Sequence, residues 1–156
     1  MGKKGWIIAL SLVAVFILLF ALRNTTPKAV QEVGATDATI YKSPTCGCCN
    51  LYSSYMSSSG FTVKLNQLDD VTPIKEKYEV PSSLSSCHTT VIEGYFIEGH
   101  VPKEAIQKLL DERPDIKGIA LPGMPSASPG MPGAKTGPFV IYSVGKDGTT
   151  KEFMRI

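Results

Sequence analysis

The sequence predicts an α/β domain in which a mixed β-sheet is flanked by helices. Two observations lead to this class. Segments with strand-like alternation follow segments with helical spacing along most of the 156-residue chain, and glycine and proline separate these segments. After an N-terminal apolar run and a polar linker, roughly 115 residues remain, which is enough for one modest domain.

Four segments in the first half predict strand, helix, strand and helix, in that order. Their bounds are residues 38–42, 48–59, 61–66 and 70–78. The first segment is β-rich and the third alternates with period two. The second has apolar residues at helical spacing, and Gly60 lies where a C-terminal cap belongs. The helical connection predicts that the first two strands are parallel.

The second half follows a serine-rich loop and predicts a hairpin, a helix, an irregular loop and a last hairpin. Their bounds are residues 90–98, 102–113, 118–137 and 139–156. The first hairpin turns at Glu93 and Gly94, and Pro102 is suited to open the helix. Repeated Pro-Gly dipeptides predict an irregular loop, with a flexible linker as the alternative.

This order of elements is the thioredoxin-like arrangement. In that fold, the turn from the first strand to the first helix carries the active cysteines, where the helix dipole stabilises thiolate. Residues 46–49 occupy that turn here. We therefore expect a thioredoxin-like core at 39–113, a Pro/Gly/Met loop at 114–137 and a C-terminal β-hairpin at 138–156.

The N-terminal residues 1–23 predict a membrane anchor or a signal segment. Lys3 and Lys4 precede an uncharged run, which Arg23 closes. A helix over this run reaches roughly 27 Å, near the minimum for a membrane span. We expect a single-span anchor with the domain outside the cytoplasm, periplasmic or extracellular, after a linker at 24–38. The alternative is a secreted domain from which a signal peptide was removed.

The charge pattern and the absence of certain motifs argue against several function classes. Net charge is +2, from 16 basic and 14 acidic residues, and no basic block lies outside the anchor. Nucleic acid is therefore not expected as a partner. Glu93 and Glu98 flank the predicted hairpin, so we expect both to be solvated. Nothing in the sequence resembles a phosphate loop, a hydrolase triad or a dinucleotide fingerprint.

Three of the four cysteines lie within four positions, at Cys46, Cys48 and Cys49. Cys46 and Cys49 have the C-x-x-C spacing of a dithiol redox site, but that pairing leaves Cys48 and Cys87 unused. Two structural disulfides are a further alternative in an exported protein. A metal site uses every thiol, together with His88 beside the fourth cysteine.

A metal site is the favoured interpretation. In a thioredoxin-like fold the loop with Cys87 and His88 packs against the cysteine turn, so four thiolates and an imidazole can converge. Adjacent cysteines fit one tetrahedral zinc ion poorly, which makes zinc less favoured. Clustered thiolates that bridge several ions suit Cu(I). We expect a Cu(I) site, open to a multinuclear cluster, in a metal-binding protein rather than a catalyst. A thiol-disulfide or copper-linked oxidoreductase is the alternative.

Four motifs carry a specific resemblance. In chain order they are KSPTCGCC, VPSSLSSCHT, GYFIEGHVP and LPGMPSASPGMP. Together they resemble a family of small exported metal-binding proteins, a domain of unknown function that includes the CopG-type copper-resistance proteins. The resemblance covers about residues 39–132. It implies a thioredoxin-like fold and a role in copper handling or resistance, with copper ions, the membrane and other copper-handling proteins as partners.

The resemblance also implies a set of metal ligands. They are Cys46, Cys48, Cys49, Cys87 and His88, with His100, Met124 and Met131 as weaker candidates. As alternatives, His100 caps the following helix, and Met124 and Met131 pack the Pro/Gly/Met loop onto the domain. Family members often have a tryptophan and then a histidine on the helix after the cysteines. Tyr52 and Tyr55 occupy those places here, so no role for that histidine is expected.

Overall fold

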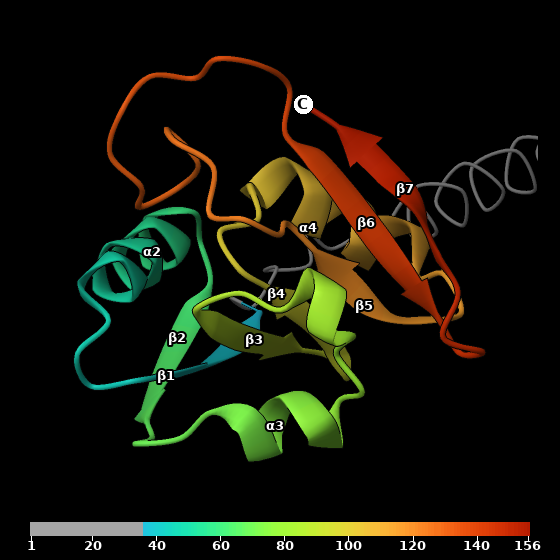
Figure 1. Cartoon of the computed structure of the whole chain (residues 1–156), viewed down its shortest axis with the longest axis horizontal. Coiled ribbons are helices and arrows are strands. Elements are labelled where there is room, and N and C mark those ends of the chain that lie inside the picture. Colours follow the sequence, from blue (N-terminus) through green and yellow to red (C-terminus); the bar gives the residue numbers. More distant parts are fainter. Residues whose placement is uncertain (1–35) are drawn as a thin grey trace, which may run out of the picture. The chain divides into compact units, whose positions relative to one another are not determined.

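The computed structural model describes residues 36–156, which form one seven-stranded mixed sheet with helices on both faces (Figure 1). The strands are β1 (Asp37–Lys42), β2 (Thr62–Gln67), β3 (His88–Ile92), β4 (Tyr95–Glu98), β5 (Ile116–Ala120), β6 (Val140–Gly145) and β7 (Thr150–Arg155). The helices are α2 (Gly47–Ser58), α3 (Thr72–Lys77) and α4 (Lys103–Glu112), with a 3₁₀ turn, η1, at Ser82–Leu84.

The expected membrane anchor at 1–23 and residues 24–35 of the expected linker lie outside the described residues, and the last two residues of that linker belong to β1. Within residues 36–156, no helix is long and apolar enough to cross a membrane.

The strand order is β2-β1-β3-β4-β5-β6-β7. β1 and β2 are parallel, and β3 is antiparallel to both β1 and β4. The predicted parallel unit and the predicted first hairpin are therefore confirmed. The last hairpin, β6–β7, is confirmed as well.

The interpretation of residues 118–137 as irregular is wrong at its start. β5 occupies Ile116–Ala120, runs parallel to β4 and pairs antiparallel with β6. It therefore joins the C-terminal hairpin to the same sheet. Gly118 permits this pairing, because a Cβ there would lie 2.1 Å from the backbone oxygen of Phe96. The irregular segment is residues 121–139, called the proline loop below.

Each face of the sheet is covered by different elements. On one face, Tyr52 and Met56 of α2 and Leu109 of α4 belong to the main buried core. On the other face, Phe96 packs in a smaller cluster with Leu84 of η1. Side chains alternate between the two faces along each strand, so β4 contributes to both clusters.

The register of β1 and β3 places the cysteine turn. Lys42, the last residue of β1, pairs with His88, the first residue of β3. The turn that follows β1 and the segment that precedes β3 therefore lie at the same end of the sheet. This is the end at which the candidate site forms.

Candidate metal centre

The cysteine turn begins at Cys46, which has extended backbone (φ −77°, ψ 95°) immediately before α2. Cys48 and Cys49 lie in the first turn of α2. Cys46 and Cys49 are joined in a disulfide with a Cα–Cα distance of 5.4 Å. The sulfurs of Cys46 and Cys48 are 3.5 Å apart. Three sulfurs therefore lie on one helix end.

The fourth cysteine reaches this turn through the pairing of β1 with β3. The sulfur of Cys49 lies 4.0 Å from the backbone oxygen of Cys87. All four sulfurs lie within 4.8 Å of one another. We call these four residues the thiol set. The structure thus brings together the four cysteines that the sequence analysis proposed as ligands, while their role as ligands stays a prediction.

A second group of donors adjoins the first. The sulfur of Cys87 lies 3.3 Å from Nδ1 of His88 and 3.2 Å from Nε2 of His100. We call Cys87, His88 and His100 the Cys-His set; their ligand atoms also lie within 4.8 Å of one another. Both histidine side chains are fully buried. Cys87 belongs to both sets and lies where they meet.

The proline loop fixes the orientation of His100. Nδ1 of His100 lies 2.6 Å from the backbone oxygen of Pro129, and only a protonated Nδ1 can donate to that oxygen. Nε2 is then the unprotonated nitrogen and presents its lone pair toward Cys87. A carbonyl that orients an imidazole in this way is the usual outer partner of a metal-bound histidine.

The proline loop also packs directly on α2 (Figure 1). A Cβ at Gly130 would lie 2.7 Å from the backbone nitrogen of Tyr52 and 3.0 Å from the backbone oxygen of Cys48. Met131 follows this contact and is half-buried, whereas Met124 is 42% exposed. Neither methionine belongs to the two sets, so a role for their sulfurs stays a prediction.

Tyr52 forms an aromatic wall behind the Cys-His set. Its ring centroid lies 4.6 Å from that of His88 and 5.4 Å from that of His100. Its hydroxyl donates to the backbone oxygen of Val101 at 3.0 Å. Tyr52 had no role predicted from the sequence, although its position one helical turn after Cys49 was a usable signal. The wall excludes water from one side of the set.

Burial sets the protonation states of this pocket. Burial lowers the pKa of His88, and it also lowers the pKa of His100. Burial, followed by the charge of Cys48, raises the pKa of Cys87 to about 11. At neutral pH and without a metal ion, the imidazoles are therefore neutral and Cys87 is a thiol. Nε2 of His88 is buried without a hydrogen-bond partner within residues 36–156.

Glu98 is fully buried, so the expectation that it is solvated is wrong. Its carboxylate accepts hydrogen bonds from the Lys75 ammonium, from the Ser86 backbone N–H at 2.6 Å and from the Thr89 hydroxyl at 2.6 Å. These bonds anchor the segment immediately before Cys87. The period-two pattern predicted the strand of Glu98 but not that α3 would supply a lysine to that face.

Glu93, by contrast, is exposed as expected and pairs with Arg113 at 2.7 Å. Lys42 had no role predicted from the sequence, and it is fully buried beneath the cysteine turn. Its ammonium donates to the backbone oxygens of Ser43 at 2.8 Å and Cys46 at 3.4 Å. It therefore holds the turn and places a positive charge beside the thiol set.

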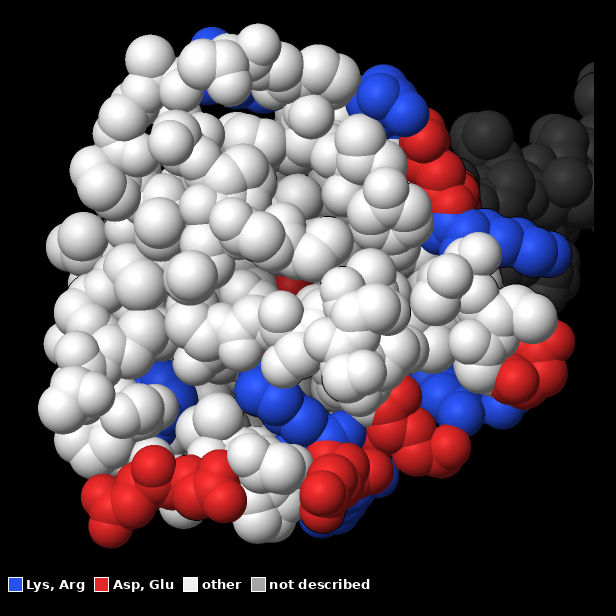
Figure 2. Space-filling view, viewed as in Figure 1, with Lys and Arg blue, Asp and Glu red and all other residues white. Residues whose placement is uncertain are grey.

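The surface around the site carries few charges. Residues 43–63 contain no Lys, Arg, Asp or Glu. Figure 2 shows a broad uncharged region over α2 and the proline loop, while charged side chains gather along the lower and right-hand rims. Selection of an ion at this site must therefore come from the donor atoms and the buried Lys42 beside them rather than from surface charge.

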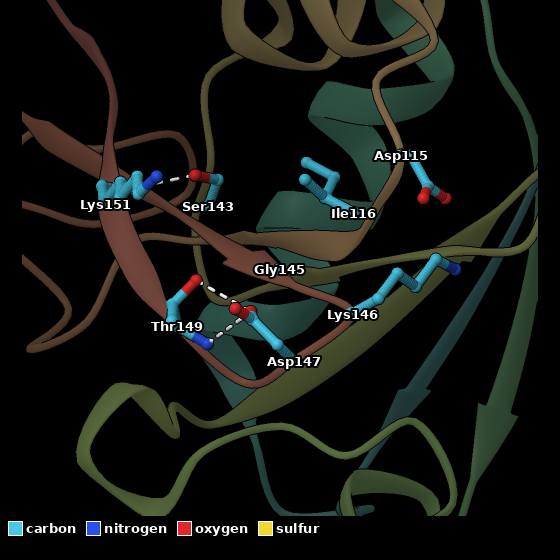
Figure 3. Close-up of a pocket in the computed structure, with 8 residues that line it drawn as sticks. All are labelled: Asp115, Ile116, Ser143, Gly145, Lys146, Asp147, Thr149 and Lys151. Carbon is cyan, nitrogen blue, oxygen red and sulfur yellow. Dashed lines mark hydrogen bonds between the residues drawn. The ribbon is translucent and has the colours of Figure 1, made fainter.

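A separate hollow lies at the turn of the C-terminal hairpin (Figure 3). It is lined by Asp115, Ile116, Ser143, Gly145, Lys146, Asp147, Thr149 and Lys151. The Asp147 carboxylate accepts bonds from the backbone N–H of Thr149 at 3.0 Å and from its hydroxyl at 2.8 Å. This pattern holds a tight turn and explains the acidic residue without a ligand.

Comparison with known proteins finds a family match over the part of the chain that contains the Cys-His set. A family model described as "Protein of unknown function, DUF411" matches residues 84–131. Two solved structures, described as "Copper resistance protein copG- Form 2" and "Copper resistance protein copG- Form 1", are each 35% identical to this chain with a TM-score of 0.73. Each match covers 78% of this chain and 98% of the solved one. No curated protein matches.

The matched residues include the Cys-His set and part of the proline loop, and the structural match extends over nearly the whole length of the solved chains. Identity at this level over that length shows common descent. The chain belongs to the DUF411 family that includes the CopG-type copper-resistance proteins.

Proposed function

We propose that this chain binds Cu(I) through its Cys/His cluster and serves in copper handling or resistance. The observation that carries the proposal is the convergence of four sulfurs and two imidazoles in one partly buried site. Thiolate is a soft ligand and prefers a soft ion such as Cu(I). The name of the two solved relatives, copper resistance protein, supports this choice of metal.

The number of donors favours more than one ion. A single ion in a closed protein site takes about four ligands, whereas the thiol set and the Cys-His set together offer six donor residues. Cys87 lies in both sets, so its sulfur is placed to bridge neighbouring ions. We expect a multinuclear Cu(I) cluster, for which zinc would be a poorer occupant because Cys48 and Cys49 are adjacent.

A thiol-disulfide oxidoreductase is the second candidate, and one observation favours it. Cys46 and Cys49 form a disulfide at the start of a helix, as in thioredoxin-like enzymes. The sheet order β2-β1-β3-β4 supports assignment of this part of the chain to that fold. Cys48 and Cys87 distinguish the candidates, because dithiol exchange needs neither and a thiolate cluster uses both.

An anaerobic titration of the reduced full-length chain tests the proposal. Cu(I) is added against a coloured Cu(I) chelator, and Zn(II) is titrated in parallel. We expect more than one Cu(I) per chain, held against the chelator. A chain whose four thiols have been alkylated is the control and should lose this binding. Saturation by a single Zn(II), with copper held no more tightly, would contradict the proposal.

We further propose that residues 1–23 anchor the domain to a membrane, outside the cytoplasm. Two lysines before an uncharged run of spanning length support this orientation. The uncharged surface around the site would suit close approach of another copper-handling protein, since no fixed charge there has to be desolvated.

A further inference from the structure

The two donor sets share one residue and respond differently to oxidation. The disulfide consumes Cys46 and Cys49, both of which belong to the thiol set only. Cys48 and Cys87 remain free thiols. The Cys-His set therefore keeps all three of its donors in the same structure that contains the disulfide.

We propose that the disulfide divides the metal centre instead of abolishing it. In the oxidised chain, Cys87, His88 and His100 hold one borderline divalent ion such as Zn²⁺, and Cys48 supplies the fourth ligand. This inference rests on the proposed function in one respect only, that the cluster is a metal centre. It adds a divalent ion as a second ligand of the centre, and it makes the redox state of Cys46 and Cys49 decide which metal is bound.

The distances fit a tetrahedral ion. With typical Zn–S and Zn–N bond lengths, the sulfur-to-nitrogen edge of a tetrahedral site is about 3.6 Å. The observed edges from Cys87 are 3.3 Å to His88 and 3.2 Å to His100. These two distances are therefore within a few tenths of an ångström of those in an occupied tetrahedral site.

Cys48 is the available fourth donor. Its sulfur lies within 4.8 Å of that of Cys87. It is half-buried on the first turn of α2, so a rotamer change can bring the sulfur to an ion. Cys48 thus gains a use in both redox states.

Oxidation changes the preferred metal as well as the count of donors. Four clustered thiolates favour a soft monovalent ion, whereas two thiolates with two imidazoles form the S₂N₂ set typical of zinc. The lone pair of His100 is already aimed by Pro129, and Tyr52 closes one side. Closing the disulfide removes two of the four thiolates that favour Cu(I) and leaves the donors of the divalent position in place.

The redox step balances with a disulfide as oxidant. The thiols of Cys46 and Cys49 together lose two electrons and two protons, and one S–S bond forms. The disulfide of a second molecule accepts both electrons and both protons, and leaves as two thiols. Oxidised glutathione supplies this reaction in the test below.

The test uses the full-length chain oxidised with glutathione disulfide, with thiol counting to establish that two free thiols remain. The probe is Co(II), whose tetrahedral sulfur-ligated complexes absorb in the visible and near ultraviolet. We expect one Co(II) per chain, with thiolate-to-cobalt absorption, and displacement of the cobalt by Zn(II). Absence of stoichiometric Co(II) and Zn(II) binding by the oxidised chain would overturn the inference.

Variants test which residues bind the divalent ion. The Cys46→Ser/Cys49→Ser double variant lacks the disulfide but keeps the Cys-His set, so it should bind Co(II) as the oxidised wild type does. Cys87→Ser and His100→Ala should weaken binding by more than the roughly 10- to 100-fold typical of losing an outer partner. Circular dichroism establishes that each variant is folded. Unchanged binding in folded Cys87→Ser or His100→Ala would contradict the proposed position.

The Cu(I) titration of the reduced chain is run beside these measurements. If the reduced chain holds several Cu(I) ions but the oxidised chain holds no divalent ion, only the divided-site inference is wrong. If the reduced chain holds no Cu(I), the proposed function fails, whatever the oxidised chain does.

Discussion

Cys87 precedes the β3–β4 hairpin in the sequence and His100 follows it, yet Nε2 of His100 is 3.2 Å from the sulfur of Cys87. The antiparallel hairpin brings its two ends back together, so the residue before β3 meets the segment that follows β4. Pro129 of the proline loop then sets the ring from the far side. Three segments distant in the sequence thus form one site, and a change in any of them should alter its metal affinity.

Replacement of Gly130 by alanine should loosen the proline loop from α2. A Cβ there would lie 2.7 Å from the Tyr52 backbone nitrogen, and a rigid helix backbone cannot give way. We expect a loss of roughly 1–3 kcal/mol in the free energy of unfolding beyond the backbone cost of a positive φ, with weaker metal binding because His100 loses its carbonyl partner. Urea unfolding and metal titration measure the two effects.

Gly123→Ala is the matched control. Gly123 has φ +79°, close to the +81° of Gly130, but a Cβ at this position would meet no atom within 4 Å. Only the backbone cost of about 1 kcal/mol is expected there. Equal effects of the two substitutions on stability and on metal affinity would show that the contact with α2 is unimportant.

Replacement of Glu98 by glutamine should destabilise the fold strongly. The buried carboxylate is the partner of Lys75, whose side chain is only 13% exposed, and it also binds the segment before Cys87. Removing one partner of a buried ion pair costs about 3–5 kcal/mol. Glu79→Gln is the control, because Glu79 is 68% exposed in its pair with Lys117 and should change stability by less than about 1 kcal/mol. Similar midpoints of denaturation for the two variants would refute the anchoring role.

Metal affinity of the oxidised chain should rise with pH. Cys87 has a pKa of about 11 in the metal-free fold, so an ion that binds its sulfur must displace a proton throughout the neutral range. We expect apparent Co(II) affinity to increase by at least about tenfold per pH unit between about pH 7 and 9. Affinity that does not vary with pH would indicate that Cys87 is not a ligand.

The same raised pKa has the opposite effect on the stability of the metal-free chain. The folded state holds its proton more tightly than the unfolded state, in which the thiol has its ordinary pKa of 9.0. This contribution is therefore complete below about pH 9 and is lost as the pH rises toward about 11. Chemical denaturation across that range should show the loss in the wild type and a smaller loss in Cys87→Ser.

The N-terminal residues should keep the protein in the membrane fraction. The uncharged run is long enough to span and is preceded by two lysines. Protease added to intact cells or spheroplasts should digest the domain, and a chain that lacks residues 1–23 should not be membrane-bound. A soluble mature form that begins near Leu22 would show instead that a signal peptide is removed.

Local sequence patterns were sufficient for most of the fold. Alternation and glycine or proline boundaries predicted β1, α2, β2 and both hairpins, because each forms within a continuous stretch of chain. β5 escaped prediction because its pairing with β4 depends on a long-range approach that Gly118 permits, and because proline-rich sequence follows it.

For the candidate site too, local features could be predicted from the sequence, whereas features that depend on long-range packing could not. Cys46, Cys48 and Cys49 are adjacent in sequence, and the fold class brought Cys87 and His88 to them. The burial of Glu98 and Lys42, and the place of Tyr52 beside the imidazoles, depend on which elements pack above those residues. No local pattern contains that information, since a charged residue in a strand or turn is normally solvated.

The most direct test of the central claim is the number of Cu(I) ions bound by the reduced chain before and after Cys48→Ser. Dithiol chemistry between Cys46 and Cys49 does not use this sulfur, so an oxidoreductase should keep its disulfide exchange in the variant. A thiolate cluster should lose Cu(I) capacity and affinity together, increasingly as the pH falls and protons compete for the remaining sulfurs. We predict that loss, with slow disulfide exchange in the wild type. Unchanged Cu(I) binding in Cys48→Ser across the pH range would contradict the copper-cluster account.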